Sequence, residues 1–429
     1  MDRIEAIHLV KRTGFGIDWA LVDQVEGLSR SAAVSLVIDF SANPDPVAPP
    51  GTFDEGGIRW RQINELQIWW LELMRSTPRP FQEKLVLFWH SHFATSGYTV
   101  AFAHQIWTDN QVFRAHSLGS FRDMAQTSAL SPAMLLYLDN FRNKASRLNE
   151  NYGRELLELH LLGPGEHHSE LDVIETSRAW TGYNTDSDRR AFVFNAGYHD
   201  QGQKTIFGIT RNWSGPEVID EAVYNTHRVV SARYIASKLW SFLAYPNPSA
   251  AVVDSIVQPY LDNNLSLAAL TRAILLHDEF YSERARTGLV RSPIEWAVSC
   301  SRSLGMPASE SRPEWATAAM GQNVFYAPDP SGWKQNEVWI TSTAAWAKAD
   351  FARFLIWRAI SNGNVTDTAD MSVPDAVEFV RLVFGLDVLS NQTRRALEDY
   401  VHAERATGIW AQTVNLMTLA MLAPEMQMG

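Results

Sequence analysis

Cysteine is almost missing from this 429-residue chain, in which Cys300 is the single example. One thiol can form neither an intrachain disulfide nor a zinc site built from several thiolates. The neighbours of Cys300 in residues 294–304 are largely apolar, so we expect a small buried hydrophobe at this position.

Long apolar runs are lacking too. No stretch approaches the roughly 20 apolar residues that a spanning helix needs, so the sequence predicts no membrane span. Residues 1–5 are mostly charged and have no apolar core of the signal-peptide kind. On these grounds the location expected by default is cytoplasmic.

Basic residues are in deficit. The 37 Lys and Arg are outnumbered by 48 Asp and Glu, which gives a formal net charge of −11. A binder of nucleic acid or of an anionic membrane needs a basic surface, so the composition argues against both partners.

Familiar catalytic motifs are missing as well. The chain has no Gly-x-Ser-x-Gly elbow, P-loop, dinucleotide fingerprint or His-Glu-x-x-His pair. The Gly-x-Gly of residues 14–16 follows a helical pattern and is too short a signal for phosphate binding. Any chemistry must therefore come from residues outside these motifs.

The chain is instead rich in helical periodicity. It predicts a mainly α fold, a large multi-helix, bundle-like body with one small β-hairpin at about residues 191–208. A Pro/Gly loop at 41–58 and another irregular segment at 324–338 interrupt the helices. The helices expected with the clearest start and stop signals cover residues 60–75, 81–93, 132–138, 150–162, 170–180, 216–224, 226–243, 249–262, 266–277 and 292–304.

The expected helix at 150–162, which Asn149 caps, is the most informative segment. At about 100° per residue, Glu150, Asn151, Arg154, Glu155 and Glu158 share one face. A solvated face with ion pairs is one interpretation. Close approach of another element is suggested by a glycine within the helix, since glycine there costs up to about 1 kcal/mol relative to alanine. The alternative is therefore an acid–base site in which Glu155, Glu158, Arg154 and His90 are catalytic.

Other polar residues of the same region could complete such a site. His90 and His92 are two apart, so a helix turns them to different faces, and satisfied buried groups are the alternative interpretation. Turn formation is the simpler interpretation of Asp139-Asn140 and of His199. Carboxylates with neutral imidazoles can bind a divalent metal, whereas carboxylates with cations can act on an anionic substrate, and both remain open. The residues expected to contribute to binding are His92, Asp139, Asn140, Asn149, Glu150, Asn151, Arg178, His199 and Lys204.

Several segments together resemble a large bacterial family of uncharacterised function, the one known as domain of unknown function 1800. The longest is Asn149-Glu150-Asn151-Tyr152-Gly153-Arg154-Glu155-Leu156-Leu157-Glu158-Leu159, and the others lie at 6–16, 82–93, 136–140, 179–182, 199–208, 238–240, 292–295 and 332–333. The chain departs from the family pattern at Ser91, where Asn is usual, and at His160 and 167–168. The resemblance implies one family domain over 1–429, with sub-parts at 1–58, 59–212 and 213–429.

The resemblance also bears on partners and location. Genes of this family often lie beside those of a secreted sulfatase-like family, and some relatives carry export signals, which keeps a periplasmic location open. Three functions therefore compete, of which one is a carbohydrate-binding protein that uses some of the 16 Trp residues. The other two are as follows. One is an enzyme of hydrolase or transferase type, with a divalent metal as an optional cofactor. The other is a non-catalytic maturation, folding or export partner of a sulfatase-like protein.

Overall fold

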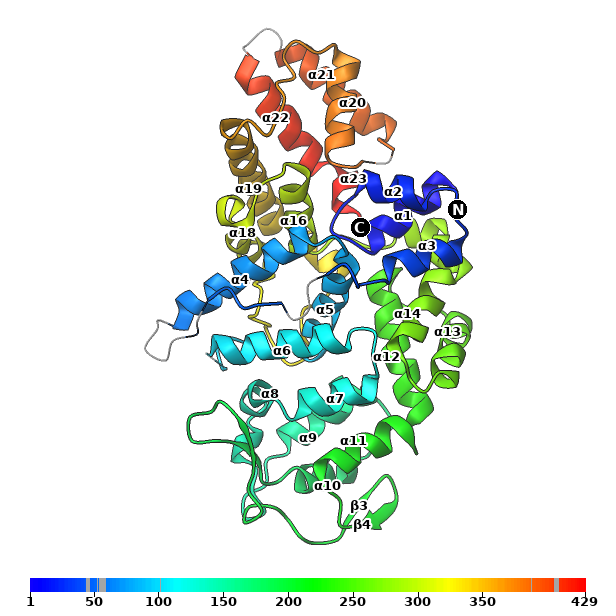
Figure 1. Ribbon diagram of the computed structural model, residues 1–429, viewed down its shortest axis with the longest axis vertical. Coiled ribbons are helices and arrows are strands. Elements are labelled where there is room, and N and C mark those ends of the chain that lie inside the picture. Colours follow the sequence, from blue (N-terminus) through cyan, green and yellow to red (C-terminus); the bar gives the residue numbers. More distant parts are fainter. Residues whose placement is uncertain (44–46, 52, 54–58, 101, 387, 405–408) are drawn as a thin grey trace.

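The described part of the chain comprises residues 1–43, 47–51, 53, 59–100, 102–386, 388–404 and 409–429 of a computed structural model. Its fold is mainly α with a small β component, as the periodicity predicts. Figure 1 shows an elongated molecule, with the last helices at one end and two β-hairpins at the other. Within these residues, no helix has the length and apolar character to cross a membrane.

The N-terminal helices begin at side-chain caps. Asp18 and Ser29 accept hydrogen bonds from the backbone N–H groups of Leu21 and Ala32. Two prolines in residues 77–80 separate the fourth helix from the fifth, as expected. Of the expected loop at 41–58, residues 44–46, 52 and 54–58 lie outside the described residues. These helices are α1 (Arg3–Arg12), α2 (Trp19–Val25), α3 (Arg30–Val37), α4 (Arg59–Ser76) and α5 (Pro80–His92).

The prediction of a regular α-helix at 150–162 is wrong in one respect, because the second half of this helix is π-helical. The chain continues from α9 (Asn151–Glu155) into the segment η2 (Leu156–Leu161), where Leu162 N donates to Leu157 O at 2.9 Å. Tyr234 Oη and His92 Nε2 bond the carbonyls of Leu159 and His160, at 2.8 and 3.0 Å. The widened turn therefore depends on partners that lie far away in the sequence.

The remaining elements of this part include α6 and α7, which we did not predict from the sequence. Ser169 and Asp172 form a capping box at the start of α10. The bounds are α6 (Ala103–His116), α7 (Phe121–Ala129), α8 (Pro132–Tyr137), the 3₁₀ turn Asn140–Arg142 and α10 (Glu170–Ala179).

The prediction of a single hairpin at 191–208 is also wrong, since the two expected strands belong to different hairpins. β1 (Tyr183–Thr185) pairs with β2 (Phe192–Phe194), and β3 (Lys204–Ile206) pairs with β4 (Ile209–Arg211), both antiparallel. Phe207 and Gly208 between β3 and β4 both have positive φ, 51° and 77°. Such a two-residue turn closes a hairpin locally, so β3 does not need β2 as its partner.

The C-terminal helices match the expected ranges closely up to residue 304. The segment 324–338 is irregular apart from one 3₁₀ turn, Asn336–Trp339. The bounds are α11 (Gly215–Tyr224), α12 (Arg228–Leu243), α13 (Ala250–Asp262), α14 (Leu267–Leu276), the 3₁₀ turn Asp278–Tyr281, α15 (Glu283–Thr287), α16 (Pro293–Ser303), α17 (Ala308–Ser311), α18 (Pro313–Ala319), α19 (Ser342–Ser361), α20 (Val373–Val383), α21 (Asn391–Glu404), α22 (Ile409–Leu422) and α23 (Pro424–Gln427).

Two large hydrophobic clusters form the interior, and α16 contributes to both. The first extends from Ala6 to Phe325 and takes Ile294 and Val298 from α16. The second lies among the C-terminal helices and includes Cys300, which is fully buried as expected. Because one helix supplies a face to each cluster, the two are packed against each other.

Candidate functional site

The polar face of α9 and η2 is held largely by ion pairs. Arg154 donates to Glu170 at 2.9 and 2.7 Å and to Glu158 at 3.3 Å. About a third of the Arg154 and Glu158 side chains is exposed, and Glu150 and Asn151 are exposed. These residues therefore fit the interpretation of a solvated, ion-paired face.

The amide side chains of the turn at residues 139–151 donate hydrogen bonds to backbone carbonyls. Asn140 is buried and donates to the carbonyls of Trp180 and Tyr183 at 3.2 and 2.9 Å. Asn149 donates to Asp139 O at 3.0 Å, and Asn151 donates to Leu138 O at 3.3 Å. The turn thus packs onto α9, and these amides are engaged within the chain.

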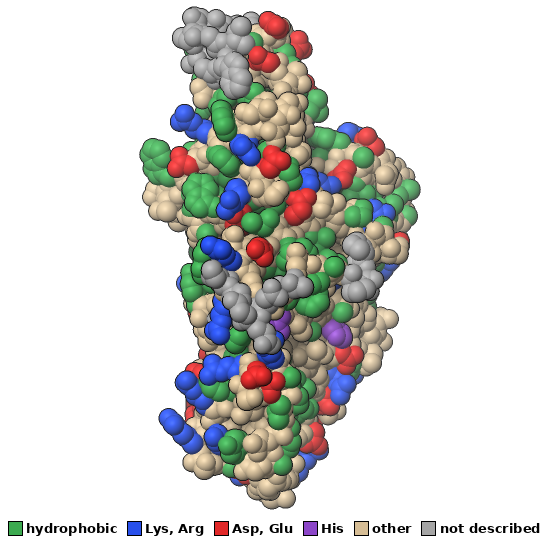
Figure 2. Space-filling model, turned by 60° about the vertical axis from the view of Figure 1, so that its left-hand side comes forward, with side chains coloured by type: hydrophobic (Ala, Val, Ile, Leu, Met, Phe, Trp, Pro, Cys, Tyr) green, Lys and Arg blue, Asp and Glu red, His purple; other side chains and the backbone are tan. Residues whose placement is uncertain are grey.

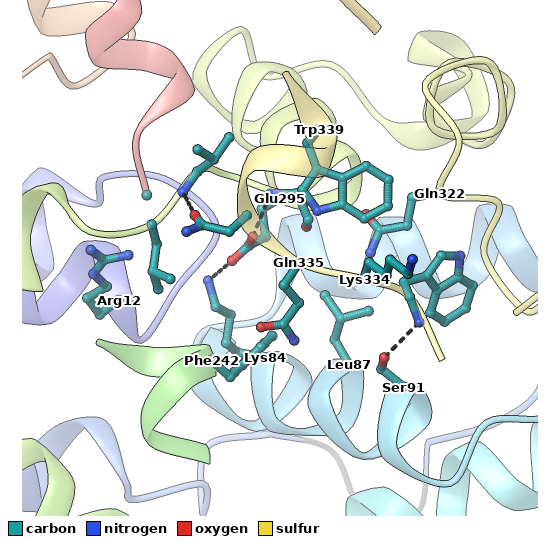
Figure 3. Close-up of a pocket in the computed structure, with 16 residues that line it drawn as sticks. Arg12, Lys84, Leu87, Ser91, Phe242, Glu295, Gln322, Lys334, Gln335 and Trp339 are labelled. Carbon is teal, nitrogen blue, oxygen red and sulfur yellow. Dashed lines mark hydrogen bonds and ion pairs between the residues drawn. The ribbon is translucent and has the colours of Figure 1, made fainter. Parts of the chain in front are cut away.

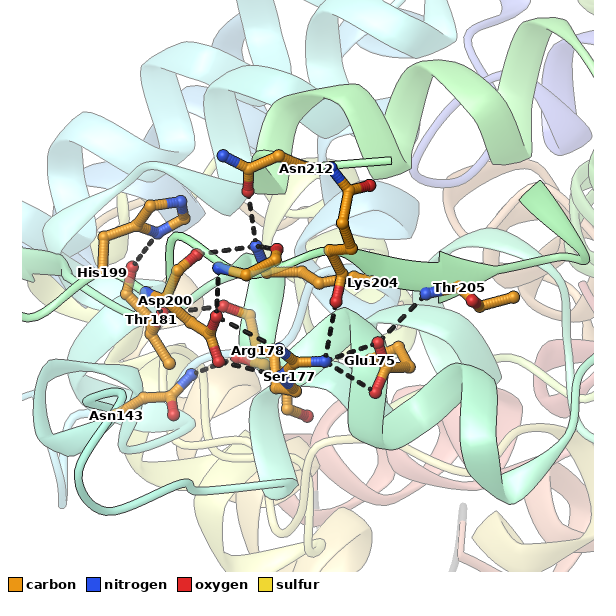
Figure 4. A network of polar contacts seen from close by, with 12 residues as sticks. Asn143, Glu175, Ser177, Arg178, Thr181, His199, Asp200, Lys204, Thr205 and Asn212 are labelled. Carbon is orange, nitrogen blue, oxygen red and sulfur yellow. Dashed lines mark hydrogen bonds and ion pairs between the residues drawn. The ribbon is translucent and has the colours of Figure 1, made fainter. Parts of the chain in front are cut away.

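The expected binding residues of the hairpin region form a second network (Figure 4). Arg178 bonds both Glu175 and Asp200, while His199 Nδ1 lies 2.8 Å from Thr181 O. Lys204 is fully buried and donates to Asp200 O, Gly202 O and Asn212 Oδ1 at 2.6–3.0 Å. All three Lys204 donors are used, so this network fastens the hairpin segment to α10.

The two histidines of α5 have different surroundings. His90 lies among aromatic rings, because the ring centroids of Trp70, Phe325 and Trp333 are 5.2–5.4 Å from its own. Burial lowers the pKa of His90 to about 3, so this ring is neutral.

His92, unlike His90, lines the cavity between α5 and α12. A carbonyl oxygen only accepts, so His92 Nε2, 3.0 Å from His160 O, must carry the ring proton. Burial and the charge of Lys238 hold the pKa of His92 well below its usual value. Its Nδ1 is thus an unprotonated acceptor, and it has no hydrogen-bond partner among the residues described.

The cavity is a cleft of about 520 Å³ between α5, α12 and the irregular segment around residue 333. We call it the α5–α12 cleft. Its volume suits a small molecule. Hydroxyl, amide, imidazole and amine groups lie beside aromatic rings, and the lining consists of Phe88, Ser91, His92, Tyr234, Ser237, Lys238, Ser241, Asn247, Pro248, Ser331, Trp333 and Gln335.

Lys238 is the cation of the cleft. Its Nζ lies 5.3 Å from the centroid of the Tyr234 ring, and within the described ranges no acceptor or carboxylate bonds it. Burial lowers the pKa of Lys238 to about 8. Its charge in turn lowers the pKa of both His92 and His160, which places the three groups near one another.

Carboxylates lie near the rim of the same cleft. Asp329 accepts from the backbone N–H of the cleft residue Ser331 at 2.9 Å. Burial, with the charges of Glu158 and Asp329, raises the pKa of Glu155. Of the expected catalytic carboxylates, Glu155 therefore has the perturbed environment that acid–base catalysis uses.

An inner chamber adjoins the cleft through Ser91, Trp333 and Gln335, which line both cavities (Figure 3). Its volume is about 40 Å³, and Lys84 forms an ion pair with Glu295 in its wall. Sequence reasoning placed Lys84 and Glu295 only among the family segments, because nothing in the sequence indicates that residues 211 positions apart meet.

Sequence reasoning also missed Lys238. This lysine follows an ordinary helical pattern, and only the packing of α12 on α5 reveals its position. Within the described ranges, no group of three or more His, Cys, Asp or Glu is arranged to hold a metal ion. Figure 2 shows acidic and basic side chains interspersed over one face of the molecule.

Comparisons with known proteins support the resemblance seen in the sequence. No curated protein and no solved structure matches the chain significantly. The family model described as Protein of unknown function (DUF1800) matches residues 8–428. Since this match covers almost the whole length, the chain belongs to the DUF1800 family.

Proposed function

We propose that the protein is an enzyme of hydrolase or transferase type that acts on a small anionic substrate in the α5–α12 cleft. The observation that carries this proposal is that His92, whose neutral ring has an unpartnered Nδ1, and the unpaired Lys238 line the same cavity. An imidazole with a free lone pair can accept a proton from a substrate or from water. A cation without a carboxylate partner attracts an anionic group.

The residues of the α9–η2 face have a supporting place in this proposal. Glu155, whose pKa is raised by burial and by the charges of Glu158 and Asp329, is the second acid–base group. Arg154 and Glu158 are positioning residues, because their ion pairs fix the helix that carries Glu155. His90 supports α5 from within its aromatic surroundings.

A panel of chromogenic phosphate, sulfate and carboxylate esters tests the proposal. We expect the wild-type protein to hydrolyse at least one class, and His92→Gln and Lys238→Met to lose at least about 90% of that rate, in keeping with the usual 10²–10⁴-fold contribution of such groups. His116→Gln, a histidine of α6, is the control and should retain the rate. Equal rates in all four proteins would overturn the assignment to this cleft.

A second candidate is the maturation, folding or export partner of a sulfatase-like protein. The observation that favours it is an apolar groove of about 410 Å³ lined by residues of α19, α22 and the chain end, beside Ile340 and Trp346, which are 67% and 74% exposed. Trp346→Glu should abolish co-purification with the sulfatase-like protein if this candidate is right. Retention of the complex in that variant argues against the groove.

A further inference from the structure

We infer that Lys238 is a nucleophilic lysine, which forms an imine with a carbonyl-bearing anion in the α5–α12 cleft. This inference rests on the proposed function, since it requires that the cleft admit a small anionic substrate. It adds the chemical class of that substrate, a small aldehyde or ketone that also carries an acidic group.

The position of Lys238 provides the first part of the argument. Its side chain lines the cavity of about 520 Å³, so a small carbonyl compound has room beside the amine. Apart from the Tyr234 ring at 5.3 Å, the described residues offer its Nζ no ion pair and no hydrogen-bond acceptor. Lys84 and Lys204, by contrast, are held by a carboxylate and by three oxygen acceptors.

The charge state of the amine is the second part. Only a neutral amine attacks a carbonyl carbon, and burial brings the pKa of Lys238 down to about 8. At pH 7 its neutral fraction is then roughly two-hundredfold larger than that of an ordinary lysine. The titratable groups around it are Tyr234 on α12, His92 on α5 and His160 on η2, none of which is a carboxylate.

The reaction balances with the groups at hand. Lys238 Nζ forms a bond to the carbonyl carbon, and the carbonyl electron pair moves to its oxygen, which takes up a proton. The nitrogen releases a proton, for which the neutral ring of His92, a residue that lines the same cleft, is the candidate base. Protonated hydroxyl then leaves as water and the C=N bond forms, with no oxidant or reductant required.

Reductive trapping tests the inference. The full-length protein is incubated at pH 7 with glyoxylate, an aldehyde with a carboxylate, and sodium cyanoborohydride reduces any imine to a stable carboxymethyl-lysine. Peptide mapping should locate the modification at Lys238, formed at least about tenfold faster than at the exposed lysines, because its neutral fraction is larger. Burial also lowers the pKa of Lys348 to about 8, but this lysine is buried and bonded to Gln427, so it should not react. The rate should rise with pH and level off above about 8.

Two variants complete the design. Lys238→Arg retains the positive charge and should lose the fast modification, whereas Lys334→Arg, which removes an exposed lysine of the adjoining chamber, should retain it. Circular dichroism checks the fold of both. Mapping of the wild-type protein alone also decides: labelling of Lys238 no faster than of other lysines overturns the inference.

Binding of an unreactive anion separates this inference from the proposed function. Calorimetry with oxalate, which forms no imine under these conditions, should show binding to both the wild-type protein and Lys238→Arg. Oxalate binding without trapping would leave the anionic cleft standing and remove the nucleophile. Trapping at Lys238 without oxalate binding would support the nucleophile and would show that the cleft does not retain an unreactive anion.

Discussion

At the residue scale, ion pairs that look alike in the sequence differ in how deeply they are buried. Glu83 and Arg114 are both buried and form two hydrogen bonds at 2.8 and 2.7 Å, and Trp70 Nε1 also donates to Glu83. Arg154 is paired as well, but its partner Glu170 is 74% exposed. Helical spacing in the sequence indicated ion pairs around Arg154. It gave no sign that Arg114 pairs with Glu83.

Arginine truncations should therefore differ in their effect on stability. Arg114→Ala strands the buried carboxylate of Glu83 and should lower the free energy of unfolding by about 3–5 kcal/mol. Arg154→Ala should cost under about 1 kcal/mol, because water solvates the released carboxylates. Urea unfolding of the two variants measures both values, and a larger loss in Arg154→Ala would contradict the solvated interpretation.

Buried histidines also make stability depend on pH. Burial lowers the pKa of His90 and His160 to about 3 and holds those of His8 and His92 well below 6.5. The unfolded chain binds protons at these groups below about pH 6.5. Stability should therefore fall as pH falls from 6.5 towards 4.5, by about 1.4 kcal/mol per pH unit for each proton.

One buried carboxyl opposes this trend. Burial raises the pKa of Asp109 to about 7, so the folded protein keeps a proton there that the unfolded chain has lost above about pH 4. Four histidines outweigh one aspartate, so the net slope still favours higher pH. In urea titrations between pH 4.5 and 6.5, Asp109→Asn should steepen the slope and His90→Phe should flatten it. Unchanged slopes would contradict these assignments.

At the element scale, sequence periodicity predicted helix existence and bounds well where prolines and capping residues mark the ends. Residues 80–92 and 170–179 are examples. It failed at η2 and at the hairpins, because their geometry depends on side chains from α5 and α12 and on a local turn. Likewise, periodicity predicted that Glu155 lies on a polar face, but it could not predict that Lys238 lies near His92.

Gly153 is the point at which α9 meets α10. A Cβ at this position would collide with Ser177 Oγ and would lie 3.0 Å from Ser177 N and from Val173 O. Gly153→Ala should therefore lower the free energy of unfolding by about 1–3 kcal/mol through overpacking. Gly51→Ala, where a Cβ meets none of the described residues within 4 Å, should be near neutral.

A second substitution tests the cause of that loss. Ser177→Ala removes the hydroxyl but leaves the backbone of α10 in place, so the double variant should regain part of the stability in the same urea experiment. No recovery would show that the backbone contacts alone set the limit.

At the scale of the whole molecule, α16 links the two hydrophobic clusters, and the ion pair between Lys84 and Glu295 joins it to α5. Burial lowers the pKa of Lys84, and Lys84 together with hydrogen bonds from Ser292 keeps the pKa of Glu295 below its usual value despite burial. The pair also lines the inner chamber beside the cleft. Its loss should therefore affect stability and cleft geometry together.

Replacing one partner and then both separates these effects. Lys84→Met leaves the largely buried carboxylate of Glu295 without its cation and should cost about 3 kcal/mol or more in chemical denaturation. Glu295→Gln still offers an oxygen to the Ser292 N–H but carries no charge, so Lys84→Met with Glu295→Gln should recover much of that loss. A double variant as unstable as Lys84→Met would show that the ammonium group itself, through its bond to Gly14 O, holds α5 against the N-terminal helices.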